Sequence, residues 1–154
     1  MAERVTAGPI PDDLDVRLQR RDTSPLPPWA LLRFQVINRG KGPWANYRWV
    51  LAQDGRWFLA RHSGADHDWQ VPFDTDLPTT PTKQVPASVV ADVEARLRQA
   101  DFLRQPHYHV DPTVQDGLYS VVTARLDNRE HEVIYNAVYP PLVEFLREII
   151  AKHG

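Results

Sequence analysis

The sequence contains no cysteine among its 154 residues. This absence excludes thiol catalysis, disulfide bonds, and zinc or iron–sulfur sites built on thiolates. No apolar run approaches the roughly 18 residues that a membrane-spanning helix needs, so we expect no membrane segment. The N-terminus also lacks the apolar core, of about 7–15 residues, that a secretory signal carries. These features together predict a cytoplasmic protein.

The chain has no strong charge of one sign. It carries 18 Lys+Arg against 20 Asp+Glu, and its formal net charge is -2. A binder of duplex nucleic acid is expected to show a broad basic surface, so the balance argues against nucleic acid as a partner. Basic residues in the first third and tryptophans that can stack on bases leave single-stranded nucleic acid as a minor alternative.

Motifs for catalysis are missing as well. No serine lies in a G-x-S-x-G turn, which places a nucleophile in many hydrolases. Only Gly40-Lys41-Gly42 approximates a glycine-rich phosphate loop, and it leads into Pro43 and a strand rather than a helix. We therefore expect no catalytic residue and no cofactor.

Hydrophobic periodicity predicts an α+β fold. Leu32, Phe34 and Val36 alternate with Arg33 and Gln35, which is typical of a strand buried on one face. Similar patterns predict strands over 29–38, 46–52, 56–61, 118–126 and 130–138, and helices over 86–100 and 140–152. Two tight turns, Asp54-Gly55 and Asp127-Asn128, indicate hairpins. The sequence thus predicts a single domain with a mostly antiparallel sheet of about five strands and two helices packed on one face.

Proline divides the chain. Fourteen prolines are present, and residues 1–28 form a Pro-rich arm that we expect to be irregular. Within the arm, 12–18 is compatible with a short helix or an edge strand. The single α+β domain then spans 29–154. Two further segments, 62–84 and 104–117, lack periodicity, and long loops of this kind often carry function.

All five tryptophans lie between positions 29 and 69. Alternation places Trp49 and Trp57 in the core of the sheet. It explains Trp44 and Trp69 least well, and tryptophan is enriched at the energetic centres of protein interfaces. The candidate binding surface consists of Trp44, Trp69, Trp29 and Phe73.

Histidines in the two irregular segments offer a second kind of site. Imidazole and carboxylate groups are common ligands of zinc and iron, and an open coordination position would activate water. Such residues are also ordinary in solvated loops, and their spacing here is not diagnostic. The candidate ligands are His62, His67, His107, His109 and Asp111.

A recurrent order of structural residues runs through most of the chain, from about 33 to 150. The matching residues are Pro43, Tyr47, Asp54, Gly55, Phe58, Gly64, Val85, Pro86, Val90, Leu97, Phe102, Tyr108, Asp116, Val133, Pro140 and Leu146. In this order the chain resembles an uncharacterised bacterial domain family. The resemblance implies a hairpin, a helix ending in Phe, a second hairpin and a C-terminal helix, with no activity attached. Members resemble small exported or lipoprotein domains, often with a cysteine pair that this chain lacks.

The sequence therefore favours a non-catalytic protein-interaction module, such as an adaptor, an inhibitor of the immunity type or an assembly subunit. Its expected partner is another protein or a second copy of itself, bound through an aromatic-rich sheet surface and the long loops. The alternative is a small metal- or ligand-binding enzyme, with a His/Asp site made by residues 62–68 and 107–111. That alternative requires the two histidine-bearing loops to converge.

Overall fold

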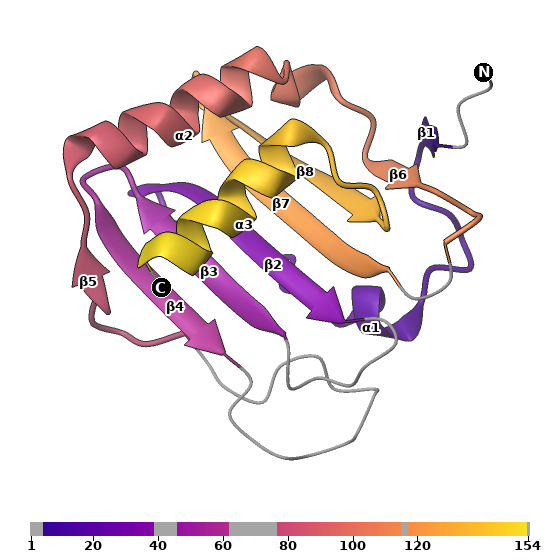
Figure 1. Cartoon of the computed structure of the whole chain (residues 1–154), viewed down its shortest axis with the longest axis horizontal. Coiled ribbons are helices and arrows are strands. Elements are labelled where there is room, and N and C mark those ends of the chain that lie inside the picture. Colours follow the sequence, from indigo (N-terminus) through magenta and orange to yellow (C-terminus); the bar gives the residue numbers. More distant parts are fainter. Residues whose placement is uncertain (1–4, 39–45, 62–76, 115–116, 154) are drawn as a thin grey trace.

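The computed structural model describes residues 5–38, 46–61, 77–114 and 117–153 (Figure 1). Within these ranges the chain forms one sheet of eight strands in the order β1-β6-β8-β7-β2-β3-β4-β5. The strands are β1 Thr6–Gly8, β2 Ala30–Asn38, β3 Tyr47–Ala52, β4 Arg56–Arg61, β5 Lys83–Gln84, β6 Tyr108–Val110, β7 Leu118–Leu126 and β8 Arg129–Asn136. The helices are α1 Val16–Gln19, α2 Ala87–Gln99, the short 3-10 helix η2 Phe102–Arg104, and α3 Pro141–His153.

The two long helices, α2 and α3, cover one face of the sheet, which we call the helix face (Figure 1). Their apolar stripes meet the inward residues of the central strands, so the main core lies between the helices and the sheet. Trp49 and Trp57 are fully buried in this core, with ring centroids 4.7 Å apart. Their predicted core position and the two predicted helices are confirmed.

Both predicted hairpins form, and the local residues explain their turns. Gly55 has a φ of 91°, and a side chain there would collide with the carbonyl oxygen of Val85. Asp127 and Asn128 both have positive φ, at 53° and 61°. Asn and Asp tolerate this left-handed conformation, which a two-residue turn requires.

The sheet differs from the prediction in size and direction. The expectation of about five antiparallel strands was wrong, because the described sheet has eight strands and is mixed. The unforeseen strands β1, β5 and β6 have two or three residues each, too few to display an alternating pattern. β6 pairs with β8 in parallel, which no hairpin rule predicts. The α+β class itself is confirmed, with α1 as an additional short helix.

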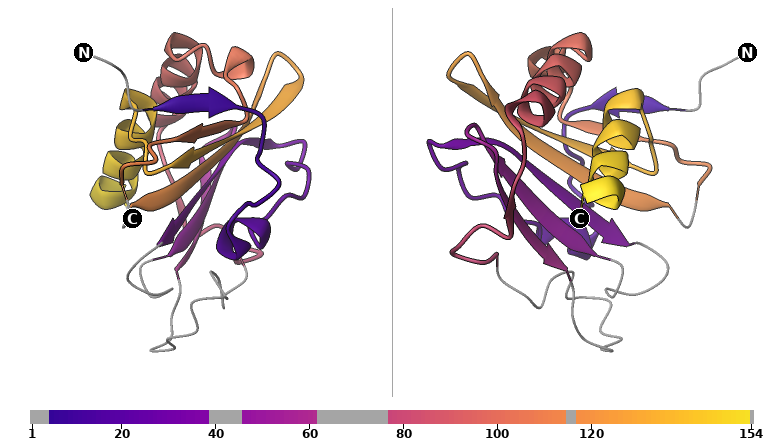
Figure 2. Two further views of the ribbon diagram at one scale, coloured as in Figure 1. Left: turned by 90° about the vertical axis from the view of Figure 1, so that its right-hand side faces the viewer. Right: turned by 60° about the vertical axis from the view of Figure 1, so that its left-hand side comes forward.

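The second face of the sheet is covered by residues 9–28, which we call the strap (Figure 2). The strap contains α1, which overlaps the 12–18 segment for which a short helix or an edge strand was expected. Leu18 of α1 is fully buried against Ile37, Val121 and Ile134, which point away from the helix face. The side of β2 that carries Arg33 and Gln35 is therefore buried too, and not open to solvent as its alternation suggested.

Polar side chains of the sheet hold the strap in place. The backbone N–H of Asp22 donates to the Gln35 Oε1 at 2.9 Å, and the Gln35 Nε2 donates to the Asp22 carbonyl oxygen at 3.0 Å. Arg21 forms a two-point ion pair with Glu132, with its Nε and Nη2 at 3.0 and 2.9 Å from the carboxylate oxygens. Such pairs fix the lateral position of the strap over the strands.

The end of the strap is anchored in the same way. Arg125 donates from its two terminal nitrogens to the carbonyl oxygens of Pro27 and Leu26, both at 2.9 Å. The backbone N–H of Leu26 donates to Glu130 Oε1 at 3.0 Å. These bonds satisfy backbone groups of a proline-rich segment that has little regular secondary structure to satisfy them.

Leu18→Ala tests whether the strap belongs to the cooperative core. Truncating this fully buried side chain should lower the free energy of unfolding by about 2–5 kcal/mol. The exposed neighbour Arg20→Ala serves as control and should change it by less than about 0.5 kcal/mol. Urea unfolding checks both, and equal midpoints for the two variants would contradict a strap that folds with the domain.

Candidate binding cleft

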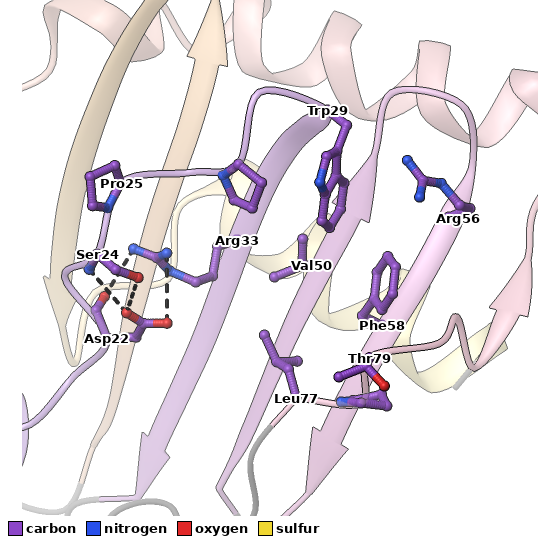
Figure 3. Close-up of a pocket in the computed structure, with 12 residues that line it drawn as sticks. Asp22, Ser24, Pro25, Trp29, Arg33, Val50, Arg56, Phe58, Leu77 and Thr79 are labelled. Carbon is purple, nitrogen blue, oxygen red and sulfur yellow. Dashed lines mark hydrogen bonds and ion pairs between the residues drawn. The ribbon is translucent and has the colours of Figure 1, made fainter.

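A cleft of about 460 Å³ opens on the strap face, between the strap and the outer strands β3 and β4 (Figure 3). This volume is within the range of ligand-binding clefts in proteins. Most of its lining is apolar, and comes from Pro25, Pro27, Trp29, Val50, Phe58 and Leu77. Strand register places Val50 and Phe58 on the same sheet face as Arg33, which explains how β2, β3 and β4 all contribute.

An aromatic stack forms one wall of the cleft. The rings of Trp29 and Phe58 lie 5.2 Å apart at an angle of 42°, and the Arg56 guanidinium lies 4.9 Å from the Trp29 ring centroid. Asp54 in turn holds Arg56, whose Nε donates to both carboxylate oxygens at 3.0 and 2.9 Å. Trp29 remains 37% exposed although Phe58 and Arg56 both contact its ring. The stack therefore presents a rigid apolar surface to solvent.

The opposite end of the cleft is polar. Arg33 is only 3% exposed, and Figure 3 shows its guanidinium directed toward Asp22 and Ser24. Its Nη2 donates to the Asp22 carbonyl oxygen at 3.0 Å, and its Nη1 lies 3.7 Å from the Asp22 Oδ2. The Nε of Arg33 has no hydrogen-bond acceptor among the described residues. This end of the cleft therefore contains a buried donor that has no acceptor among the described residues.

Asp22 is held as a carboxylate. Burial acts to raise the pKa of Asp22, but hydrogen bonds from Ser24 and the positive charges of Arg33 and Arg48 outweigh it and hold this pKa below its ordinary value. The Ser24 backbone N–H and hydroxyl both donate to Asp22 Oδ1, at 3.0 and 2.6 Å. The polar end consequently carries one fixed negative charge beside the Arg33 cation at neutral pH.

Of the predicted binding surface, the structure places Trp29 in this cleft. Trp44, Trp69 and Phe73 lie outside the described residues. Sequence reasoning missed Arg33 and Phe58, which line the cleft beside Trp29. Alternation along β2 places Arg33 and Gln35 on one face, but alternation alone reads that face as open to solvent.

The histidine hypothesis is covered only in part, because His62 and His67 lie outside the described residues. The His107 ring packs 5.0 Å from the His131 ring, and the His109 ring packs 5.1 Å from Tyr135. The Asp111 carboxylate instead accepts hydrogen bonds from the backbone N–H and hydroxyl of Thr113, at 3.0 and 2.6 Å. Within the described ranges, no three His, Asp or Glu side chains are grouped to hold a metal ion.

Comparisons with protein-family models, curated proteins and solved structures find no match to this chain. The resemblance to an uncharacterised bacterial family thus rests on the residues that carry it and gains no support from a family model. In the described part of the chain, no helix has the length and apolar character to cross a membrane, as expected from the sequence.

His109 makes the stability of the fold sensitive to acid. Burial lowers the pKa of its imidazole below the ordinary value near 6.5 and outweighs the hydrogen bond to the Pro106 carbonyl. As the pH falls, the unfolded chain takes up this proton before the folded chain does, so the free energy of unfolding should decrease below about pH 6.5. His109→Phe keeps a ring against Tyr135 and should flatten the decrease. Urea unfolding at pH 7.5 and 5.5 checks this, and an unchanged decrease would contradict it.

Proposed function

We propose that the chain is a non-catalytic protein-interaction module that binds its partner at the Trp29 cleft. The observation that supports this best is the partly exposed Trp29 ring, held by its contacts with Phe58 and Arg56. Rigid, partly exposed tryptophans supply a large contact area at little entropic cost, and they recur as energetic centres of interfaces.

The chemistry of the cleft favours binding over catalysis. Its charged side chains are Asp22, Arg33 and Arg56. Arginine stays protonated in proteins, and the pKa of Asp22 is held below its ordinary value, so none of the three exchanges a proton readily near neutral pH. General acid–base catalysis needs a group that titrates close to the working pH. The Ser24 hydroxyl donates to the Asp22 carboxylate, which is too weak a base at this pKa to activate it.

The shape of the cleft suits an extended segment of a partner protein. Pro25 of the strap lies on one side, and Trp29 and Phe58 lie on the other (Figure 3). Aromatic-lined grooves of this kind bind extended or proline-containing peptides in several recognition modules. Such a surface suits an adaptor, an inhibitor or an assembly subunit. We also propose that the protein acts in the cytoplasm.

Trp29→Ala should weaken partner binding without unfolding the domain. A random heptapeptide display library would be selected on the immobilised full chain, and the retained clones would be retested on the variant. We expect clones that bind the wild type and lose at least about tenfold in affinity on Trp29→Ala, which is typical for an interface centre.

Tyr139→Ala provides the matched control. The exposed fraction of Tyr139, 39%, is similar to the 37% of Trp29, and Tyr139 does not line the cleft. Clones should bind this variant as they bind the wild type. Circular dichroism and thermal unfolding would verify that both variants are folded. A selection whose clones all ignore the loss of Trp29 would contradict the proposed function.

A further inference from the structure

The polar end of the cleft has an incomplete arginine site. Arg33 and Arg21 both join the strap to the sheet, Arg33 from β2 and Arg21 from the strap itself, but they differ in how their guanidinium groups are used. In Arg21, the Nε and Nη2 donate together to Glu132 at 3.0 and 2.9 Å. In Arg33, the Nη2 donates to the Asp22 carbonyl oxygen, and the Nε finds no acceptor among the described residues. One arm of the Arg33 fork is therefore buried and unpaired.

Arg33 is deeply buried, yet its positive charge is poorly compensated by negative groups. Its nearest carboxylate oxygen, the Asp22 Oδ2, lies 3.7 Å from Nη1, which is longer than a hydrogen bond. The other oxygen of Asp22 is engaged by Ser24. A guanidinium that is 3% exposed loses most of its hydration, and a donor left without an acceptor adds to that loss. An incoming oxygen acceptor with a negative charge would offset both.

We propose that the partner is an extended acidic peptide, which places a carboxylate on the unpaired Nε of Arg33, a residue that lines the cleft, and an apolar side chain against Trp29 and Phe58. This inference rests on the proposed function and specifies its ligand. Arginine suits the role because its planar fork matches a carboxylate oxygen with a directed, charge-assisted hydrogen bond.

Arg56 adds a second positive charge at the other end of the cleft. Its guanidinium lies over Trp29 and is 36% exposed, so it adds a second cation at the rim of the cleft. Asp54 forms an ion pair with Arg56 at 2.9 Å. Screening by solvent makes the electrostatic contribution of Arg56 smaller than that of Arg33. A peptide with an acidic residue thus meets a cation at either end of the aromatic wall.

The sequences retained in the display selection provide the first test. Clones that depend on Trp29 should share an Asp or Glu near a proline or aromatic residue. The consensus heptapeptide and its Glu→Gln counterpart would then be synthesised with a fluorescein label, and their dissociation constants measured by fluorescence anisotropy. We expect the Glu peptide to bind the wild type roughly tenfold more tightly than the Gln peptide.

Three variants assign this preference to Arg33. Arg33→Lys retains the charge but lacks the fork, and should reduce the preference to less than about twofold. Arg104→Gln removes an arginine that is 85% exposed and does not line the cleft, and should leave the tenfold preference unchanged. Asp22→Asn removes the competing negative charge, and should tighten binding of the Glu peptide by about threefold. Asp22→Asn also keeps the test decisive if Arg33→Lys fails to fold.

The outcomes separate this inference from the proposed function. Clones that need Trp29 but show no acidic preference would overturn the carboxylate assignment and leave the binding function standing. A preference for Glu that persists in Arg33→Lys and is unchanged by Asp22→Asn would move the carboxylate away from Arg33 and overturn the inference as well. Clones that do not need Trp29 would overturn the proposed function itself.

Discussion

The hydrogen bonds between Gln35 and the backbone of Asp22 fix the layer on which the cleft depends. A sheet with helices on one face has a second face to cover, and here a strap with one short helix covers it. Because Gln35 both donates and accepts, it sets the strap at one position along β2. That position places the Asp22 carbonyl oxygen within reach of Arg33 and carries the strap onward to Trp29. The strap then lines the cleft together with Trp29 and Phe58.

The use of polar groups beneath the strap has a physical reason. Residues 25, 27 and 28 are prolines, which lack a backbone N–H and cannot join a sheet as an inner strand. Side chains of the sheet therefore supply the bonds that a strand would otherwise make, as Arg125 does for the carbonyl oxygens of Pro27 and Leu26. Buried polar pairs add little net stability, but an unmatched group is costly. These polar pairs therefore favour one position of the strap over the neighbouring positions along the strands.

Local patterns predicted the parts of this fold that local interactions make. Three features were predicted in this way: the turn at Asp54-Gly55, the burial of Trp49 and Trp57, and helix α2. Each follows from residues that are close together in the sequence. The mixed sheet and the cleft depend on contacts between distant segments, which periodicity does not register.

Arg33 shows the limit of the sequence analysis most clearly. Its alternation with Leu32 and Phe34 is correct, yet the face on which it lies is covered by a segment that alternation cannot place. Trp29 was among the predicted surface residues, but its partners Phe58 and Arg56 come from another strand. A candidate residue was thus found from composition, whereas the site around it required the fold.

The separation in sequence between the strap and its anchors also sets the order of folding. Arg21 and Glu132 are 111 residues apart, and Arg125 and Pro27 are 98 apart. Closing loops of this length costs conformational entropy, and the anchors Arg125 and Glu132 lie on β7 and β8, so the strap can dock only after these strands have been made. On the ribosome the strap is therefore synthesised early but docks late. Until then the apolar strap face stays uncovered, which makes this period the one in which the nascent chain is most prone to aggregate.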